Sequence, residues 1–101
     1  MIEIHRVHTF SNDIIMQMTD KDELICEAKA VANNDGTAEI ISIGLDSYDM
    51  GKALLNAIDL MGIKDVFCKN SEMDRLLRAL RFKEEDGVYK LNLEGYFTGG
   101  C

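Results

Sequence analysis

The chain has 101 residues, which allow one domain, residues 1–101, with a modest hydrophobic core. Its 47% hydrophobic and 29% charged residues are typical of a globular protein, and a formal net charge of -7 argues against nucleic acid as a partner. No apolar run reaches the roughly 20 residues of a membrane span, and no signal peptide is recognisable. We therefore expect a cytoplasmic protein that binds no membrane.

The first part of the chain predicts four strands. Beta-forming residues occupy 1–7, 14–18 and 23–31, and the last of these segments alternates with a two-residue period. Residues 33–36 read Asn-Asn-Asp-Gly, which is a strong turn signal. The segments 23–31 and 37–45 are therefore expected to form a hairpin.

Two amphipathic helices follow. The first is predicted over 49–61, with Ser47 or Asp49 as its N-cap and Gly62 at its end. The second begins at 71–74, where Ser-Glu-Met-Asp resembles a capping box with Asp in place of the usual Glu or Gln. The expected buried stripes are Met50, Leu54, Ala57, Ile58 and Met61 in the first helix, and Met73, Leu76, Leu77 and Leu80 in the second.

One strand between the helices and one or two strands after the second helix complete the predicted order. Residues 64–68 are short and apolar, as in a buried strand, and the Asp-Gly pair at 86–87 turns the chain into a strand over 88–97. The order predicts an α+β fold, with a mixed, mostly antiparallel sheet of about six strands and two helices. The crossover from strand 37–45 through the first helix to strand 64–68 should be right-handed, with those two strands parallel.

The start of the first helix is the most informative place in the sequence. A strand that leads directly into a helix N-terminus leaves unpaired backbone N–H groups beside the positive end of the helix dipole. Such a place suits a phosphate group. The sequence therefore suggests a phosphate-bearing cofactor.

The cysteine and histidine residues do not predict a metal site. Cys26 and Cys68 lie in apolar strand segments, where a free Cys behaves as a small hydrophobe, and Cys101 is at the chain end. None of them has the close spacing of zinc ligands. His5 and His8 are three residues apart, so on one strand they point to opposite faces.

Residues 37–97, about three-fifths of the chain, resemble the GNAT superfamily of acetyl-CoA-dependent N-acetyltransferases. The resemblance depends on the joint order of several short pieces rather than on any one of them. These pieces are Ala-Glu-Ile-Ile-Ser-Ile at 38–43, Gly-Lys-Ala-Leu-Leu at 51–55, Gly-Ile-Lys-Asp-Val-Phe at 62–67, Asn70, Leu-Arg-Phe at 80–82, and residues 85–93.

The resemblance implies a binding site for acetyl-CoA. In the family the pantetheine arm lies along the strand before the first helix, which places Ile43 and Leu45 beside it. The diphosphate rests on the backbone amides that match Met50, Gly51 and Lys52. Gly51 has a second interpretation, as an ordinary small residue in a first helical turn.

The resemblance also implies a catalytic group. Glu39 matches the strand carboxylate that helps to deprotonate the acceptor amine, and Asn70 matches an Asn that hydrogen-bonds the cofactor. Each residue has a simpler interpretation. Glu39 then is a surface carboxylate on a half-exposed strand, and Asn70 is a helix cap.

The chain departs from the family pattern in three places. Asp46 and Asp49 stand where the diphosphate loop usually has a basic residue or Gln and a Gly, and like charges there oppose phosphate binding. Leu77 stands where a tyrosine often protonates the leaving thiolate, and Arg81 replaces the Gly before Phe. The two early helices of the family have no room in the 8–13 connection.

Two functions of different classes remain open from the sequence. The first is an acetyl-CoA-dependent N-acetyltransferase that acts on a small or N-terminal amine. The second is a non-catalytic domain of the same fold that binds CoA weakly or serves in protein interaction. A homodimer that covers the apolar surface and the open edge of a short sheet fits either function.

Overall fold

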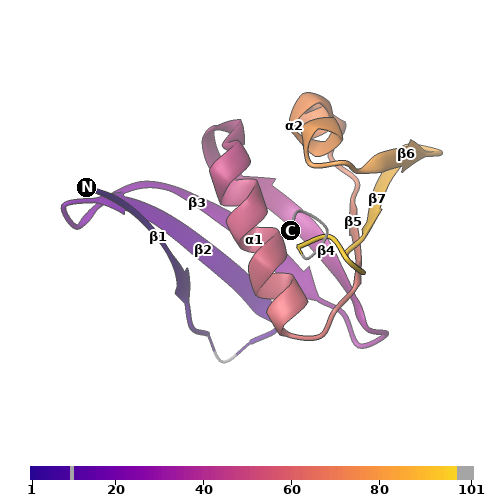
Figure 1. The fold of residues 1–101 in the computed structure, drawn as a ribbon, viewed down its shortest axis with the longest axis horizontal. Helices are drawn as coiled ribbons and strands as arrows, with labels where there is room; N and C mark the ends of the chain where they lie inside the picture. Colours follow the sequence, from indigo (N-terminus) through magenta and orange to yellow (C-terminus); the bar gives the residue numbers. More distant parts are fainter. Residues whose placement is uncertain (10, 98–101) are drawn as a thin grey trace.

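The computed structural model describes residues 1–9 and 11–97, which form one mixed sheet with helices packed on one face (Figure 1). The strand order in the sheet is β1-β2-β3-β4-β5-β7-β6. In chain order the elements are β1 (Ile2–Val7), β2 (Asp13–Asp20), β3 (Glu23–Ala32), β4 (Thr37–Ile43), the 3₁₀ turn η1 (Gly44–Asp46), α1 (Tyr48–Leu60), β5 (Asp65–Cys68), the 3₁₀ turn η2 (Ser71–Met73), α2 (Asp74–Ala79), β6 (Lys83–Glu85) and β7 (Val88–Asn92).

This order confirms the predicted α+β class with two α-helices, and the sheet has seven strands rather than about six. The additional strand is β6, which pairs with β7 across the predicted turn at Gly87. The last strand is shorter than expected, because β7 ends at Asn92 and the chain turns over residues 94–97. Cys101 lies outside the described residues.

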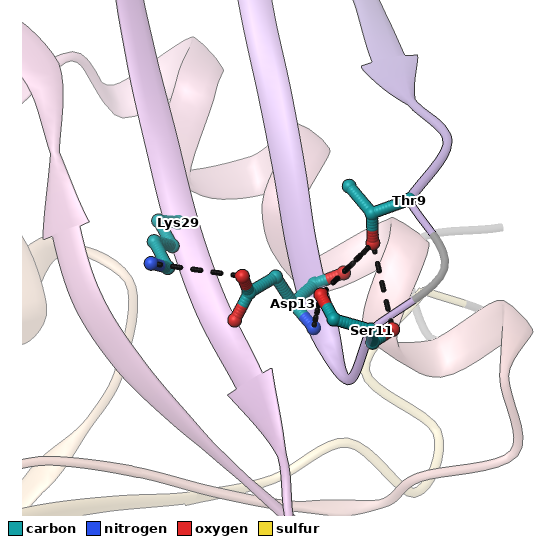
Figure 2. Close-up of polar contacts among 4 residues, drawn as sticks. All are labelled: Thr9, Ser11, Asp13 and Lys29. Atoms are coloured by element: carbon teal, nitrogen blue, oxygen red, sulfur yellow. Dashed lines mark hydrogen bonds and ion pairs between the residues drawn. The ribbon is translucent and has the colours of Figure 1, made fainter.

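Strands β1 to β4 follow one another as antiparallel neighbours, and β1 is joined to β2 by a short connection (Figure 2). Thr9 Oγ1 donates to the carbonyl oxygen of Asp13 at 3.0 Å, and the Asp13 N–H donates to Ser11 Oγ at 3.2 Å. The Asp13 carboxylate lies 3.7 Å from Lys29 Nζ on β3. These contacts fix the turn that leads from β1 directly into β2.

One hydrophobic core lies between the sheet and its two helices. In Figure 1, α1 crosses the strands of the first half of the sheet, and α2 lies near β6 and β7. The apolar stripes predicted for both helices are buried, except that Met61 is 44% exposed because α1 ends at Leu60. Gly62 follows with φ of 83°, a conformation that glycine adopts at low cost and that ends the helix. Neither helix in the described part of the chain is long and apolar enough to cross a membrane.

Both helical segments begin with a side-chain cap. Ser47 caps α1, since its Oγ accepts a hydrogen bond from the Met50 N–H. The second segment is capped by Asn70, one residue before the predicted Ser71, and starts with a 3₁₀ turn. The predicted capping box is therefore wrong at this helix.

Candidate functional site

The central feature of the sheet is a fork between β4 and β5. These parallel strands pair at Thr37–Asp65, Ala38–Val66 and Glu39–Phe67. In β4 the register with β3 shifts between Ile40 and Ser42, so Ile41 is an extra residue of a β-bulge. A bulge bends its strand. The result is that β4 runs on to Ile43 without a β5 partner beyond Glu39.

Glu39 lies at the apex of this fork. Its neighbours Ala38 and Ile40 are buried against the helices, so the half-buried Glu39 points to the opposite, uncovered face of the sheet. Among the described residues it has no hydrogen-bond or ion-pair partner. Burial raises the pKa of the adjacent Cys68 thiol, and the Glu39 charge contributes to the same shift. A carboxylate without a partner at this place is able to accept a proton from an incoming amine.

The first turn of α1 differs from the sequence-based prediction. The Met50 N–H donates to Ser47 Oγ at 3.2 Å, and the Gly51 N–H donates to the Ser47 carbonyl at 3.0 Å. The expectation that these two amides are free is therefore wrong. Within the described part of the chain, the amides left without an acceptor at the helix start are those of Tyr48 and Asp49.

Gly51 is a packing glycine in this structure. A Cβ added to it would lie 2.7 Å from Leu80 Cδ1 and 3.6 Å from Ile43 Cδ1. Met50 beside it is fully buried. The first turn of α1 thus contacts the end of α2 through Gly51, which favours the simpler of its two interpretations.

A small cavity of about 250 Å³ lies between the start of α1 and α2, where the Tyr48 side chain is part of its wall. Arg75 supplies a cation to the lining, whereas Asp46 and Glu72 supply carboxylates. The exposed Arg75 side chain has no ion-pair partner among the described residues. The free amides at the start of α1 and the Arg75 side chain are thus groups that suit a phosphate. The sequence could have indicated that the Tyr48 and Asp49 amides stay free, because Ser47 is a possible N-cap and the position of the N-cap determines which amides lack an acceptor.

The remaining predicted cofactor residues are dispersed. Ile43 is 4% exposed and belongs to the core, whereas Leu45 is 75% exposed with φ of 58°. Lys52 Nζ lies 4.5 Å from the Tyr96 ring centroid and lines a different cavity of about 490 Å³. The Asn70 side chain accepts the Glu72 N–H at 3.0 Å, as a cap does.

Leu77, at the position of the missing tyrosine, is fully buried. The Tyr89 hydroxyl donates to Asp74 and has its pKa raised mainly by that bond. The Tyr96 hydroxyl donates to the Leu80 carbonyl at 2.9 Å, and burial raises its pKa. Among the described residues, no group of His, Cys, Asp and Glu side chains is placed to hold a metal ion.

Solved structures with the same fold exist. A protein assigned to the GNAT family of acetyltransferases from Desulfovibrio desulfuricans superposes with a TM-score of 0.67 at 17% identity, over 81% of this chain and 69% of its own. A GNAT-family acetyltransferase from Staphylococcus aureus Mu50 has a TM-score of 0.65 at 11% identity, over 82% of this chain and 69% of its own. The GNAT domain of S. lividans PAT has a TM-score of 0.57 at 17% identity, over 84% of this chain and 62% of its own.

No protein-family model matches the chain, and no curated protein matches its sequence. At these low identities the structural likeness shows the fold and not the activity.

Proposed function

We propose that this chain, which has the fold of the GNAT acetyltransferases, is an acetyl-CoA-dependent N-acetyltransferase that acts on a small or N-terminal amine. One observation carries the proposal: a carboxylate without a partner, Glu39, lies at the apex where two parallel strands separate. A separated strand end offers backbone groups to an extended ligand, and a nearby carboxylate offers general-base chemistry.

The cofactor would lie at the open end of the fork. The β4 backbone near Ile43 and Leu45 would face the pantetheine arm, and the amides of Tyr48 and Asp49 would hold a phosphate with the help of Arg75. This position is earlier in α1 than the Met50 and Gly51 amides that the sequence suggested. The roles of Asn70 and Lys52 in cofactor binding stay predictions, since Asn70 caps the second helical segment and Lys52 lines a different cavity.

Acetyl-CoA supplies an activated acetyl thioester when bound. Glu39 would take the proton from the acceptor ammonium, directly or through one water, and so produce the neutral amine that reacts. Leu77 cannot donate a proton, so water or a group of the substrate would protonate the departing thiolate. Loss of one such group slows a reaction but does not abolish it, since general acid–base groups contribute about 10²–10⁴-fold each.

A second candidate is a non-catalytic domain that binds CoA weakly or serves in protein interaction. The hydrogen bonds of the Met50 and Gly51 amides to Ser47 favour it, because these are the amides that the resemblance assigns to the diphosphate. Asp46 and Glu72 in the neighbouring cavity also oppose an anion. A homodimer through the uncovered sheet face would suit either candidate.

Titration of acetyl-CoA into the isotope-labelled protein, followed by amide chemical shifts, tests the cofactor site. We expect saturable shifts at Tyr48 and Asp49 and weaker binding in Arg75→Gln. Arg78→Gln is the matched control, because Arg78 is on the same helix but is paired with Asp74 at 2.9 Å outside the cavity. Absence of any saturable shift at millimolar acetyl-CoA would refute cofactor binding and favour protein interaction.

Amine-dependent release of free thiol from acetyl-CoA tests catalysis. We expect Glu39→Gln to slow this release by about 10²-fold or more while acetyl-CoA binding is unchanged. Glu27→Gln is the control, since Glu27 is a sheet carboxylate that accepts a bond from Gln17 at 2.6 Å and lies on β3, which does not border the gap between β4 and β5. Equal rates in both variants would contradict the role of Glu39.

A further inference from the structure

A cavity of about 470 Å³ opens on the sheet face that the helices leave uncovered. Residues of β5, β6 and β7 supply most of its lining. Its volume is within the roughly 300–1,000 Å³ of small-molecule sites. Glu39 is not part of this lining, so the kind of ligand that the cavity suits is determined by other residues.

The apolar part of the lining includes Phe67 and Val88. Val66 and Cys68 on either side of Phe67 are buried in the core, and so is Tyr89 next to Val88. Because side chains alternate along a strand, Phe67 and Val88 point to the uncovered face, where both are half-buried. The exposed part of an aromatic ring is a surface on which a flat apolar group packs well.

Three lysines lie around Phe67 in this cavity, although the chain has a net charge of -7. Lys90 is directly opposite Phe67 on β7, and Lys83 is directly opposite Lys90 on β6. Lys69 follows Phe67 by two residues, and its Nζ is 5.7 Å from the centroid of the Phe67 ring. A group that packs on this ring is therefore close to positive charge.

Two carboxylates also line the cavity, and both already have a partner. Asp65 accepts a hydrogen bond from Asn92 Nδ2 at 2.9 Å, and Glu85 lies 3.4 Å from Lys90 Nζ. Three ammonium groups against two carboxylates leave the lining with one net positive charge. The cavity thus favours an anion with a single charge.

Lys83 and Lys90 form a like-charged pair across two antiparallel strands. Side chains at such directly opposed positions are close, and like charges there destabilise the sheet. Glu85 offsets part of this repulsion through Lys90, whereas neither Lys83 nor Lys69 has an ion-pair partner in the described part of the chain. An anion bound beside these lysines would reduce the repulsion between β6 and β7.

We infer that this cavity binds a small aromatic monocarboxylate, with its ring on Phe67 and its carboxylate toward the lysines. One carboxylate matches the single net positive charge of the lining, and an aromatic ring matches the apolar surface of Phe67 and Val88. The inference does not rest on the proposed acetyltransferase function, because neither Glu39 nor acetyl-CoA takes part in it.

Titration of the full chain with phenylacetate, followed by amide chemical shifts without acetyl-CoA, tests this site. Phenylacetamide has the same ring without the charge, and acetate has the carboxylate without the ring. We expect phenylacetate to shift the Phe67 and Lys90 amides saturably and to bind several-fold more tightly than phenylacetamide. Acetate should give no saturable shift at the same concentrations. Added salt should weaken the binding of phenylacetate, because it screens exposed charges.

Lys83→Met removes one ammonium group and keeps a long, flexible side chain. Since an exposed ion pair contributes little, we expect this variant to bind phenylacetate about twofold to fivefold more weakly and phenylacetamide unchanged. Removal of Lys83 also removes its repulsion with Lys90, so the free variant should be at least as stable in urea as the native protein. Weaker binding then cannot be the result of unfolding.

Lys21→Met is the matched control. Lys21 is exposed in the turn between β2 and β3, outside the cavity, and it too lacks an ion-pair partner among the described residues. Equal binding of phenylacetate and phenylacetamide would overturn the inference, as would an equal loss of binding in the Lys83 and Lys21 variants. Shifts at Phe67 that follow protein concentration, together with a dimer in sedimentation, would overturn it as well, since this face would then be an interface between copies of the chain.

Discussion

The sequence resemblance gives Gly51 a role in binding a phosphate, whereas the structure gives it a role in packing. Replacement of Gly51 by alanine distinguishes these two roles. If this glycine serves a bound phosphate, then Gly51→Ala in the free protein should stabilise α1, since alanine is favoured over glycine in a helix by about 0.8–1.0 kcal/mol. If it serves packing, then the added methyl group collides with Leu80. Gly51→Ala therefore raises the free energy of unfolding in the first case and does not raise it in the second.

The magnitude follows from the contact. The new Cβ would lie 2.7 Å from Leu80 Cδ1, whereas carbon atoms prefer about 3.5–4.0 Å, so one of them must move by about 1 Å. Leu80 is fully buried, so its side chain can move only by displacing other core side chains. Overpacking of this kind costs about 1–3 kcal/mol, so after the helix gain we expect Gly51→Ala to destabilise by about 0–2 kcal/mol.

Urea unfolding followed by circular dichroism measures this change, and a double-mutant cycle with Leu80→Val identifies its cause. Leu80→Val shortens the side chain that is in the way. In that background Gly51→Ala should become neutral or stabilising, with a coupling energy of about 1–2 kcal/mol. A coupling energy near zero would refute the packing explanation, and a stabilised single variant would do the same.

Three further results follow from the structure. Asn70→Ala should lower the free energy of unfolding by about 1 kcal/mol because it removes the cap, and Ser71→Ala should change it by under about 0.5 kcal/mol, both measured in urea. Ser47→Ala should cost about 1 kcal/mol and release the Met50 amide, visible as faster hydrogen exchange there; unchanged exchange would contradict the cap. In the native protein an alkylating reagent should modify the buried Cys68 more slowly than Cys26, since burial limits access and raises the pKa of the Cys68 thiol; mass spectrometry of peptides distinguishes the two.

Most of the fold was predictable because its elements have strong periodic patterns. The alternation in β3 and the apolar stripes of the two helices each correspond to one buried face, which the structure confirms for Ala28 and Ala30 and for Leu54 and Ile58. The sequence allows one or two strands after α2, because Lys83–Glu85, which forms β6 by pairing with β7, has no apolar residue. Met61 was assigned to the buried stripe because the pattern does not reveal that α1 ends before it.

The site was less predictable, since its geometry depends on contacts between distant residues. The packing of Gly51 against Leu80 joins two helices, and no local pattern reports it. The position of Glu39 at the apex depends on where β5 stops pairing with β4, which the composition of either strand does not state.

The short ladder between β4 and β5 also has a mechanical consequence. It is the only backbone pairing between the first four strands and the last three in the described part of the sheet, and it ends after Glu39 and Phe67. Because so few backbone pairs join the two parts of the sheet, we expect deformation of the sheet to concentrate where β4 and β5 separate. A small change in the angle between these two strands should cost the least energy, and a ligand that binds between them would widen that angle.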